Sequence, residues 1–305
     1  MSLLNILTPL YLLITLGFIL NKYRFPNKEF WPGIERMTYY ILFPTLIFVA
    51  LVKVPVDLSL LGKILIVILI PAIVSGLLQW LGFVSPNLDK TTFSSMFQGA
   101  VRNNTPVALV IGAWLVPDKG LAIMAVIILV MLPYNNISSI LILLRYGKPI
   151  DNNLFAWWHG VAKNPFIIAC ALGLSFNLLE IKLPAPLIDT ADFLGRSALP
   201  FALLAVGAGL KFNSIFENKI AILLSSTAKL IVFPLMCWGL CVLLNVEADF
   251  AKIAIIFSAV PTAISSYILA RQMGGDAEGM AQIISFQILL AAFTLPVFLL
   301  ITQQY

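Results

Sequence analysis

Ten apolar stretches constrain this chain more than any other feature of its sequence. They cover residues 3–20, 36–53, 60–82, 92–115, 120–144, 158–178, 187–210, 219–244, 250–270 and 280–302. Each comes close to the roughly 20 helical residues that cross the roughly 30 Å hydrocarbon core of a bilayer. The short connections leave no room for a soluble domain. Only 11% of the residues are charged, against about 25% in soluble domains, so the sequence predicts an all-α membrane protein with ten transmembrane helices.

The lysines and arginines of the connections predict how these spans are oriented. Connections after odd-numbered spans carry more of them than connections after even-numbered spans. Short cytoplasmic loops are enriched in Lys and Arg, so we expect both termini to face outward from the cell inner (plasma) membrane. The net charge of +5 fits such loops, and no basic patch with interleaved aromatic residues points to nucleic acid.

The two halves of the chain, residues 1–150 and 151–305, echo each other at a near-constant offset. Pro44 matches Pro200, and Lys63 matches Lys219, each pair about 156 residues apart. Five spans per half is an odd number, so the second copy must be inverted in the membrane. The sequence therefore predicts two inverted five-helix repeats.

One span in each half is interrupted by proline. A proline has no N–H group and disfavours helical geometry at the residue before it, so the backbone should open at both places. Open backbone and polar groups at membrane depth are tolerated only where protein buries them or they line a wet cavity. Paired interruptions in inverted halves indicate a transporter's binding site. The candidate substrate-binding residues are Arg102, Asn103, Asn104, Thr105 and Pro106 at the first break, and Ser258, Pro261 and Thr262 at the second.

Arg102 is the most informative of these residues, because its own span contains no acidic residue. A basic residue at the bilayer centre costs at least about 2.5–3.5 kcal/mol, so Arg102 needs a partner. That partner is either an anionic ligand or the carbonyls of the broken helix. Thr105 is the expected N-cap of a half-helix starting at Pro106, whose N–H groups would favour a carboxylate. The neighbouring amides could hold ligand oxygens or satisfy the crossing backbone.

Other intramembrane polar residues have structural interpretations. Asp192 and Arg196 lie four residues apart on one helix face and are expected to pair. Lys229 either snorkels or donates to backbone carbonyls. Polar residues of the fifth and tenth spans, such as Asn136 and Gln287, are expected to bond between helices. The three cysteines are interpreted as buried thiols, no metal or cofactor is expected, and no hydrolase, metalloprotease or phosphate-loop motif predicts an enzyme.

The order of motifs resembles the auxin efflux carrier family, in the superfamily that contains bile acid–sodium symporters. The resemblance implies spans four and nine that cross at their proline breaks, with Asn104, Pro106 and Pro261 flanking the substrate. It further implies a scaffold of spans 1, 2, 6 and 7, a transport domain of spans 3–5 and 8–10, and elevator-like alternating access. It makes a homodimer plausible. The residues that carry the likeness are 103–109, 164–166, 199–201, 207–210, 261–270, 275–276, Ala281 and 294–296.

One departure from the family limits what the resemblance implies. The plant exporters carry a long cytoplasmic loop between their halves, whereas residues 145–157 form a short connection here. An auxin substrate is therefore not implied. The sequence predicts a secondary active transporter or facilitator for a small organic anion, a mono- or dicarboxylate. A ligand-binding membrane receptor or sensor without transport, and an anion channel, remain alternatives.

Overall fold

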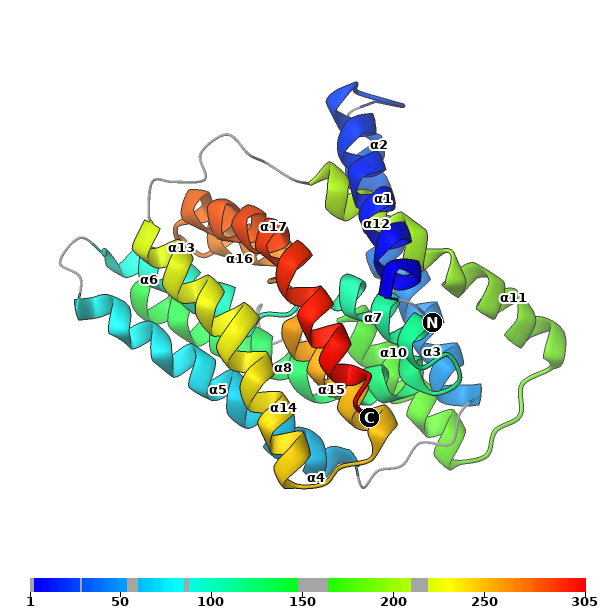
Figure 1. Ribbon diagram of the computed structural model, residues 1–305. Coiled ribbons are helices and arrows are strands. Elements are labelled where there is room, and N and C mark those ends of the chain that lie inside the picture. The colour runs from blue at the N-terminus through cyan, green and yellow to red at the C-terminus, as the bar shows by residue number, and fades with distance from the viewer. Residues whose placement is uncertain (1–2, 28, 54–59, 85–87, 148–163, 210–218) are drawn as a thin grey trace. The chain divides into compact units, whose positions relative to one another are not determined.

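The computed structural model is helical throughout the part it describes, with no strand there (Figure 1). The described part leaves out residues 1–2, 28, 54–59, 85–87, 148–163 and 210–218. The chain divides into two compact units. Unit 1 comprises Met1–Leu60, Pro106–Leu129 and Trp158–Leu210, and unit 2 comprises Leu61–Thr105, Val130–Trp157 and Lys211–Tyr305.

Unit 1 is built on close helix packing. Gly17 of α1 lies so near the Leu204 carbonyl of α12, and Gly207 of α12 so near the Ile14 carbonyl, that neither position has room for a Cβ atom. Small residues of this kind let helix backbones approach each other in membrane proteins. The helices of this unit are α1 (Leu3–Lys22), α2 (Phe30–Met37), the π-helical turn η1 (Thr38–Leu42), α3 (Phe43–Lys53), α10 (Pro165–Leu178), α11 (Ala185–Arg196) and α12 (Ala198–Ala208), with most of α7 (Thr105–Leu115) and the first part of α8 (Gly120–Tyr146).

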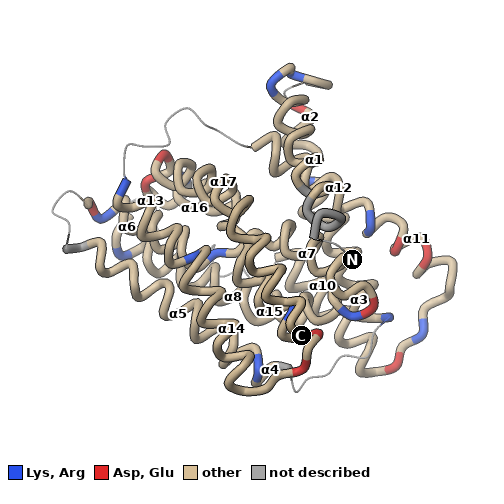
Figure 2. Tube along the Cα trace, viewed as in Figure 1, with Lys and Arg blue, Asp and Glu red and all other residues tan. Residues whose placement is uncertain are grey.

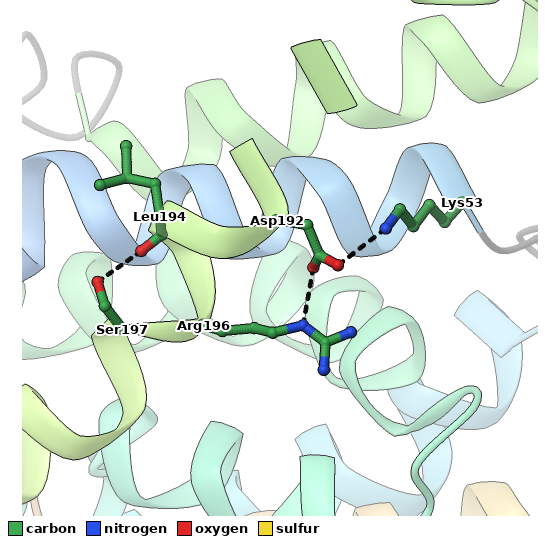
Figure 3. Close-up of polar contacts among 5 residues, drawn as sticks. All are labelled: Lys53, Asp192, Leu194, Arg196 and Ser197. Atoms are coloured by element: carbon green, nitrogen blue, oxygen red, sulfur yellow. Dashed lines mark hydrogen bonds and ion pairs between the residues drawn. The ribbon is translucent and has the colours of Figure 1, made fainter. Parts of the chain in front are cut away.

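Unit 1 also contains the expected ion pair. The Nε of Arg196 lies 3.1 Å from one carboxylate oxygen of Asp192, and the Nζ of Lys53 lies 2.9 Å from the other (Figure 3). The predicted pairing of Asp192 with Arg196 is confirmed, and α3 contributes a second cation that the sequence analysis did not pair. Arg196 thus has a structural partner and needs no ligand to explain it.

Unit 2 contains the remaining helices. They are α4 (Leu60–Ile64), the π-helical turn η2 (Leu65–Leu69), α5 (Ile70–Leu77), the 3₁₀ helix η3 (Leu78–Val84), α6 (Lys90–Val101), the second part of α8, α13 (Lys219–Thr227), the π-helical turn η4 (Ala228–Val232), α14 (Phe233–Leu243), α15 (Ala248–Ala259), α16 (Ser265–Gln272) and α17 (Ala277–Thr302). Aromatic rings join α6 to its neighbours, since Phe93 packs edge-on against Trp80 of η3 and Tyr146 of α8. Acidic residues lie mostly near helix ends (Figure 2).

Three prolines each follow a π-helical turn. Pro44, Pro71 and Pro234 come two residues after η1, η2 and η4 respectively. A proline removes one backbone hydrogen bond and its ring clashes with the carbonyl four residues earlier. A wider π turn relieves that clash and lets the helix continue past the proline.

Six helical segments are long and apolar enough to span a membrane. They are Phe30–Lys53, Leu61–Gly82, Gly120–Tyr146, Ala185–Ala208, Lys219–Leu243 and Ala277–Thr302. Tyr11–Lys22 and Pro165–Leu178 are shorter apolar helices. The predicted spans 92–115 and 250–270 are each two short helices, which a length criterion does not select. An all-helical, multi-pass membrane protein is therefore supported, while the count of ten inverted spans stays a prediction.

Candidate functional site

Both predicted breaks are present, and their backbones open in the same way. Helix α6 ends at Val101, and Arg102 after it is extended, with φ −75° and ψ 145°. Helix α15 ends at Ala259, and Val260 after it has φ −67° and ψ 149°. The helix after the first break begins at Thr105, one residue earlier than predicted, so Thr105 is not its N-cap. Pro106 fits at its second position because N–H groups of a first helical turn lack intrahelical acceptors anyway.

Within unit 2 the two breaks touch backbone to backbone. The amide N–H of Asn104 donates to the carbonyl of Pro261 over 2.9 Å. The Thr262 hydroxyl donates a longer bond, 3.4 Å, to the Gln98 carbonyl of α6. Three predicted residues, Asn104, Pro261 and Thr262, therefore meet at one place.

A buried glutamine of α17 joins the two breaks. Gln287 accepts a bond from the N–H of Thr262 at 2.9 Å through its side-chain oxygen, and its nitrogen donates to the carbonyl of Gly99 at 3.0 Å. The Gln287 amide therefore bonds the N–H of Thr262 at the second break and the carbonyl of Gly99 near the end of α6 at the first break. The interhelical role expected for Gln287 is confirmed.

The end of α15 is served by two side chains. Asn103 donates to the Phe257 carbonyl at 2.7 Å, and Lys229 donates through Nζ to the Ser258 carbonyl at 3.0 Å. Lys229 is fully buried, and its Nζ lies 4.5 Å from the centroid of the Phe233 ring. Of the two alternatives for Lys229, the carbonyl contact is the one observed. The Ser258 hydroxyl donates to the Ile255 carbonyl, and Ser258 contacts Lys229 through its backbone carbonyl.

Arg102 is nearly buried, with 7% of its surface exposed. One terminal nitrogen donates to the amide oxygen of Asn136 in α8, and the other donates to the hydroxyl of Ser265 in α16, both at 3.2 Å. Both acceptors are neutral, and these two bonds orient the guanidinium. Neither acceptor was among the predicted site residues, although Ser265 follows the second break by one turn.

Several buried polar groups of unit 2 have no hydrogen-bond partner among the described residues. Gln98 is fully enclosed, yet neither its amide oxygen nor its amide nitrogen is bonded. The Ser266 hydroxyl and the Asn135 amide oxygen are in the same condition. Buried polar groups are nearly always hydrogen-bonded, so unmet ones near the two breaks mark a place suited to a polar ligand or water.

Seven of the eight predicted residues thus lie in unit 2: Arg102, Asn103, Asn104, Thr105, Ser258, Pro261 and Thr262. The eighth, Pro106, falls in unit 1 with the rest of α7. Whether these residues bind substrate stays a prediction. The three cysteines are free and buried, as expected.

The match to a known protein family covers the second half of the chain. Residues 150–299, just under half of the chain, match the family model described as "Membrane transport protein", which is the auxin efflux carrier type. The resemblance to that family is confirmed. A protein of Rhizobium meliloti (strain 1021) named "Putative malonate transporter" is 27% identical over 136 residues, which cover 44% of this chain and 42% of that protein. The matched region thus spans less than half of either protein, and membrane transport is the function these likenesses support.

Proposed function

We propose that this chain is a secondary transporter or facilitator that moves a small organic anion, a mono- or dicarboxylate, across the membrane. The observation that carries the proposal is the Arg102 guanidinium, which is buried at the first break with its terminal nitrogens oriented by Asn136 and Ser265. The relative named for malonate supports a carboxylate, since malonate is a small dicarboxylate.

The chemistry of the site fits this ligand class. A guanidinium presents a planar fork of N–H donors that matches the two oxygens of a carboxylate. An arriving carboxylate would accept from the terminal nitrogens of Arg102 that now donate to Asn136 and Ser265. The unmet amide of Gln98 would supply one further donor and one acceptor for the polar remainder of the substrate.

The proposal includes the transport architecture expected from the sequence. Ten spans would form two inverted repeats, residues 1–150 and 151–305, with elevator-like movement of the domain that carries the substrate. The division into compact units agrees with this in part. Unit 1 groups the four predicted scaffold spans and unit 2 groups spans 3 and 8–10, but residues 106–129, which belong to spans 4 and 5 of the predicted transport domain, fall in unit 1. We also propose that the protein is no enzyme, lies in the plasma membrane with both termini outside, and works as a homodimer.

Counterflow in proteoliposomes tests the function. Vesicles loaded with unlabelled malonate should accumulate labelled malonate, or another acid of a small carboxylate panel, with saturable kinetics, and should ignore a labelled cation. Arg102→Gln should abolish this flux, because a neutral amide cannot offset a carboxylate's charge. Arg196→Gln is the matched control, since Arg196 is paired with Asp192 in unit 1 and should leave flux unchanged.

Each contrary outcome has a meaning. Normal flux by Arg102→Gln would remove Arg102 from the site. Saturable binding of an acid without any flux would favour a receptor, and flux without saturation or counterflow would favour a channel.

A further inference from the structure

Lys229 is the buried charge that the proposed substrate site does not use. It lies in η4, inside the membrane-spanning segment Lys219–Leu243, and none of its surface is exposed. Its Nζ contacts the Ser258 carbonyl and the face of Phe233, and it has no ion pair in the described part of the chain. Burying a lysine in this way costs free energy, so its position calls for a physical explanation.

The ammonium group of Lys229 lies at the carboxyl end of α15, and this position explains its burial. Ser258 is the second-last residue of α15, and the last carbonyls of a helix have no intrahelical N–H partner. They carry the negative end of the helix dipole, which a cation stabilises. In transporters built on broken helices, the carboxyl ends of half-helices near the bilayer midplane coordinate Na⁺ or a proton. The Phe257 carbonyl next to it is occupied by the Asn103 amide.

We propose that the ammonium of Lys229 is the resident cation of the second break. It holds the carboxyl end of α15 in place of an alkali ion, so anion transport by this protein needs no Na⁺ there. The face of Phe233 adds a second favourable contact for the same charge. This inference rests on the proposed function for its transport readout, and on protein stability for a readout independent of it.

Chemical rescue tests the inference. Lys229→Ala removes the ammonium and opens the space that its side chain filled. Its flux should fall by about tenfold, near the upper end of the effect that a helix-end charge can carry. Ethylammonium should restore flux in a saturable way and should raise the melting temperature of purified Lys229→Ala. Lys219→Ala is the matched control, because Lys219 begins α13 in the same helical run but is exposed, and neither readout should respond there.

Lys229→Met separates charge from packing. Methionine fills much of the same space without charge, so this variant should fold, lose flux and show no rescue by ethylammonium. Wild-type flux should be equal in Na⁺ and choline media. Undiminished flux by Lys229→Met, or saturable stimulation of wild-type flux by Na⁺, would overturn the inference.

The proposed transport function and the proposed role of Lys229 can be overturned by different results. If the wild type moves no anion, the proposed function fails, while the melting-temperature arm still tests Lys229. Stabilisation of Lys229→Ala by ethylammonium, absent from the wild type and from Lys219→Ala, would support the resident cation without any flux. Equal response of all three proteins would overturn it.

Discussion

The two proline breaks of unit 2 have nearly the same backbone but are stabilised by different chemistry. At the first, the end of α6 accepts from the amide of Gln287 at Gly99 and from the hydroxyl of Thr262 at Gln98, which are both neutral donors. At the second, the end of α15 meets the buried ammonium of Lys229 as well as an amide. The proline determines where a helix ends, and side chains from other helices determine whether a charged or a neutral donor contacts the carbonyls at that end.

We expect the largest loss of stability on substitution of Gln287, whose side chain forms hydrogen bonds with both breaks. Gln287→Leu would leave the N–H of Thr262 and the carbonyl of Gly99 buried without these partners. Each unmet group costs about 1–3 kcal/mol, so we expect a loss of about 2–6 kcal/mol in unfolding free energy. Equilibrium unfolding in mixed micelles would measure it. A loss no larger than that of Thr262→Val would mean that Gln287 does not join the breaks.

A second prediction concerns close approach at the first break. A Cβ atom on Gly99 would lie 2.7 Å from the Cγ2 of Ile283 and would also clash with Ser225. Gly99→Ala should therefore force α6 away from α13 and α17, at a cost of about 1–3 kcal/mol. Gly239→Ala in α14 is the control, because a Cβ there meets nothing within 4 Å. That variant should be neutral or slightly stabilising, and equal melting temperatures for the two would contradict the close approach.

Most helices and the positions of both breaks were predictable from the sequence, because hydrophobic periodicity and proline act on the local backbone. The apolar stretches located the helices, and the two prolines located both breaks. Asn136 and Ser265 could not be predicted as partners of Arg102, because their contact depends on how α8 and α16 pack against α6. The same holds for Lys53, whose bond to Asp192 joins residues 139 apart in sequence. The start of α7 was misplaced by one residue because its first turn accepts proline at more than one position.

The smallest expected effect tests how much the direct contact between the breaks depends on side chains. Thr262→Val removes only the hydroxyl, whose bond to the Gln98 carbonyl is long at 3.4 Å, while the backbone bond from Asn104 to Pro261 remains at 2.9 Å. We expect a loss of about 0.5–1.5 kcal/mol at most, which is the net worth of an ordinary hydrogen bond. Thr262→Ser, which keeps the hydroxyl, should retain the bond. A loss approaching that of Gln287→Leu would mean that the hydroxyl, and not the backbone pair, holds the two breaks together.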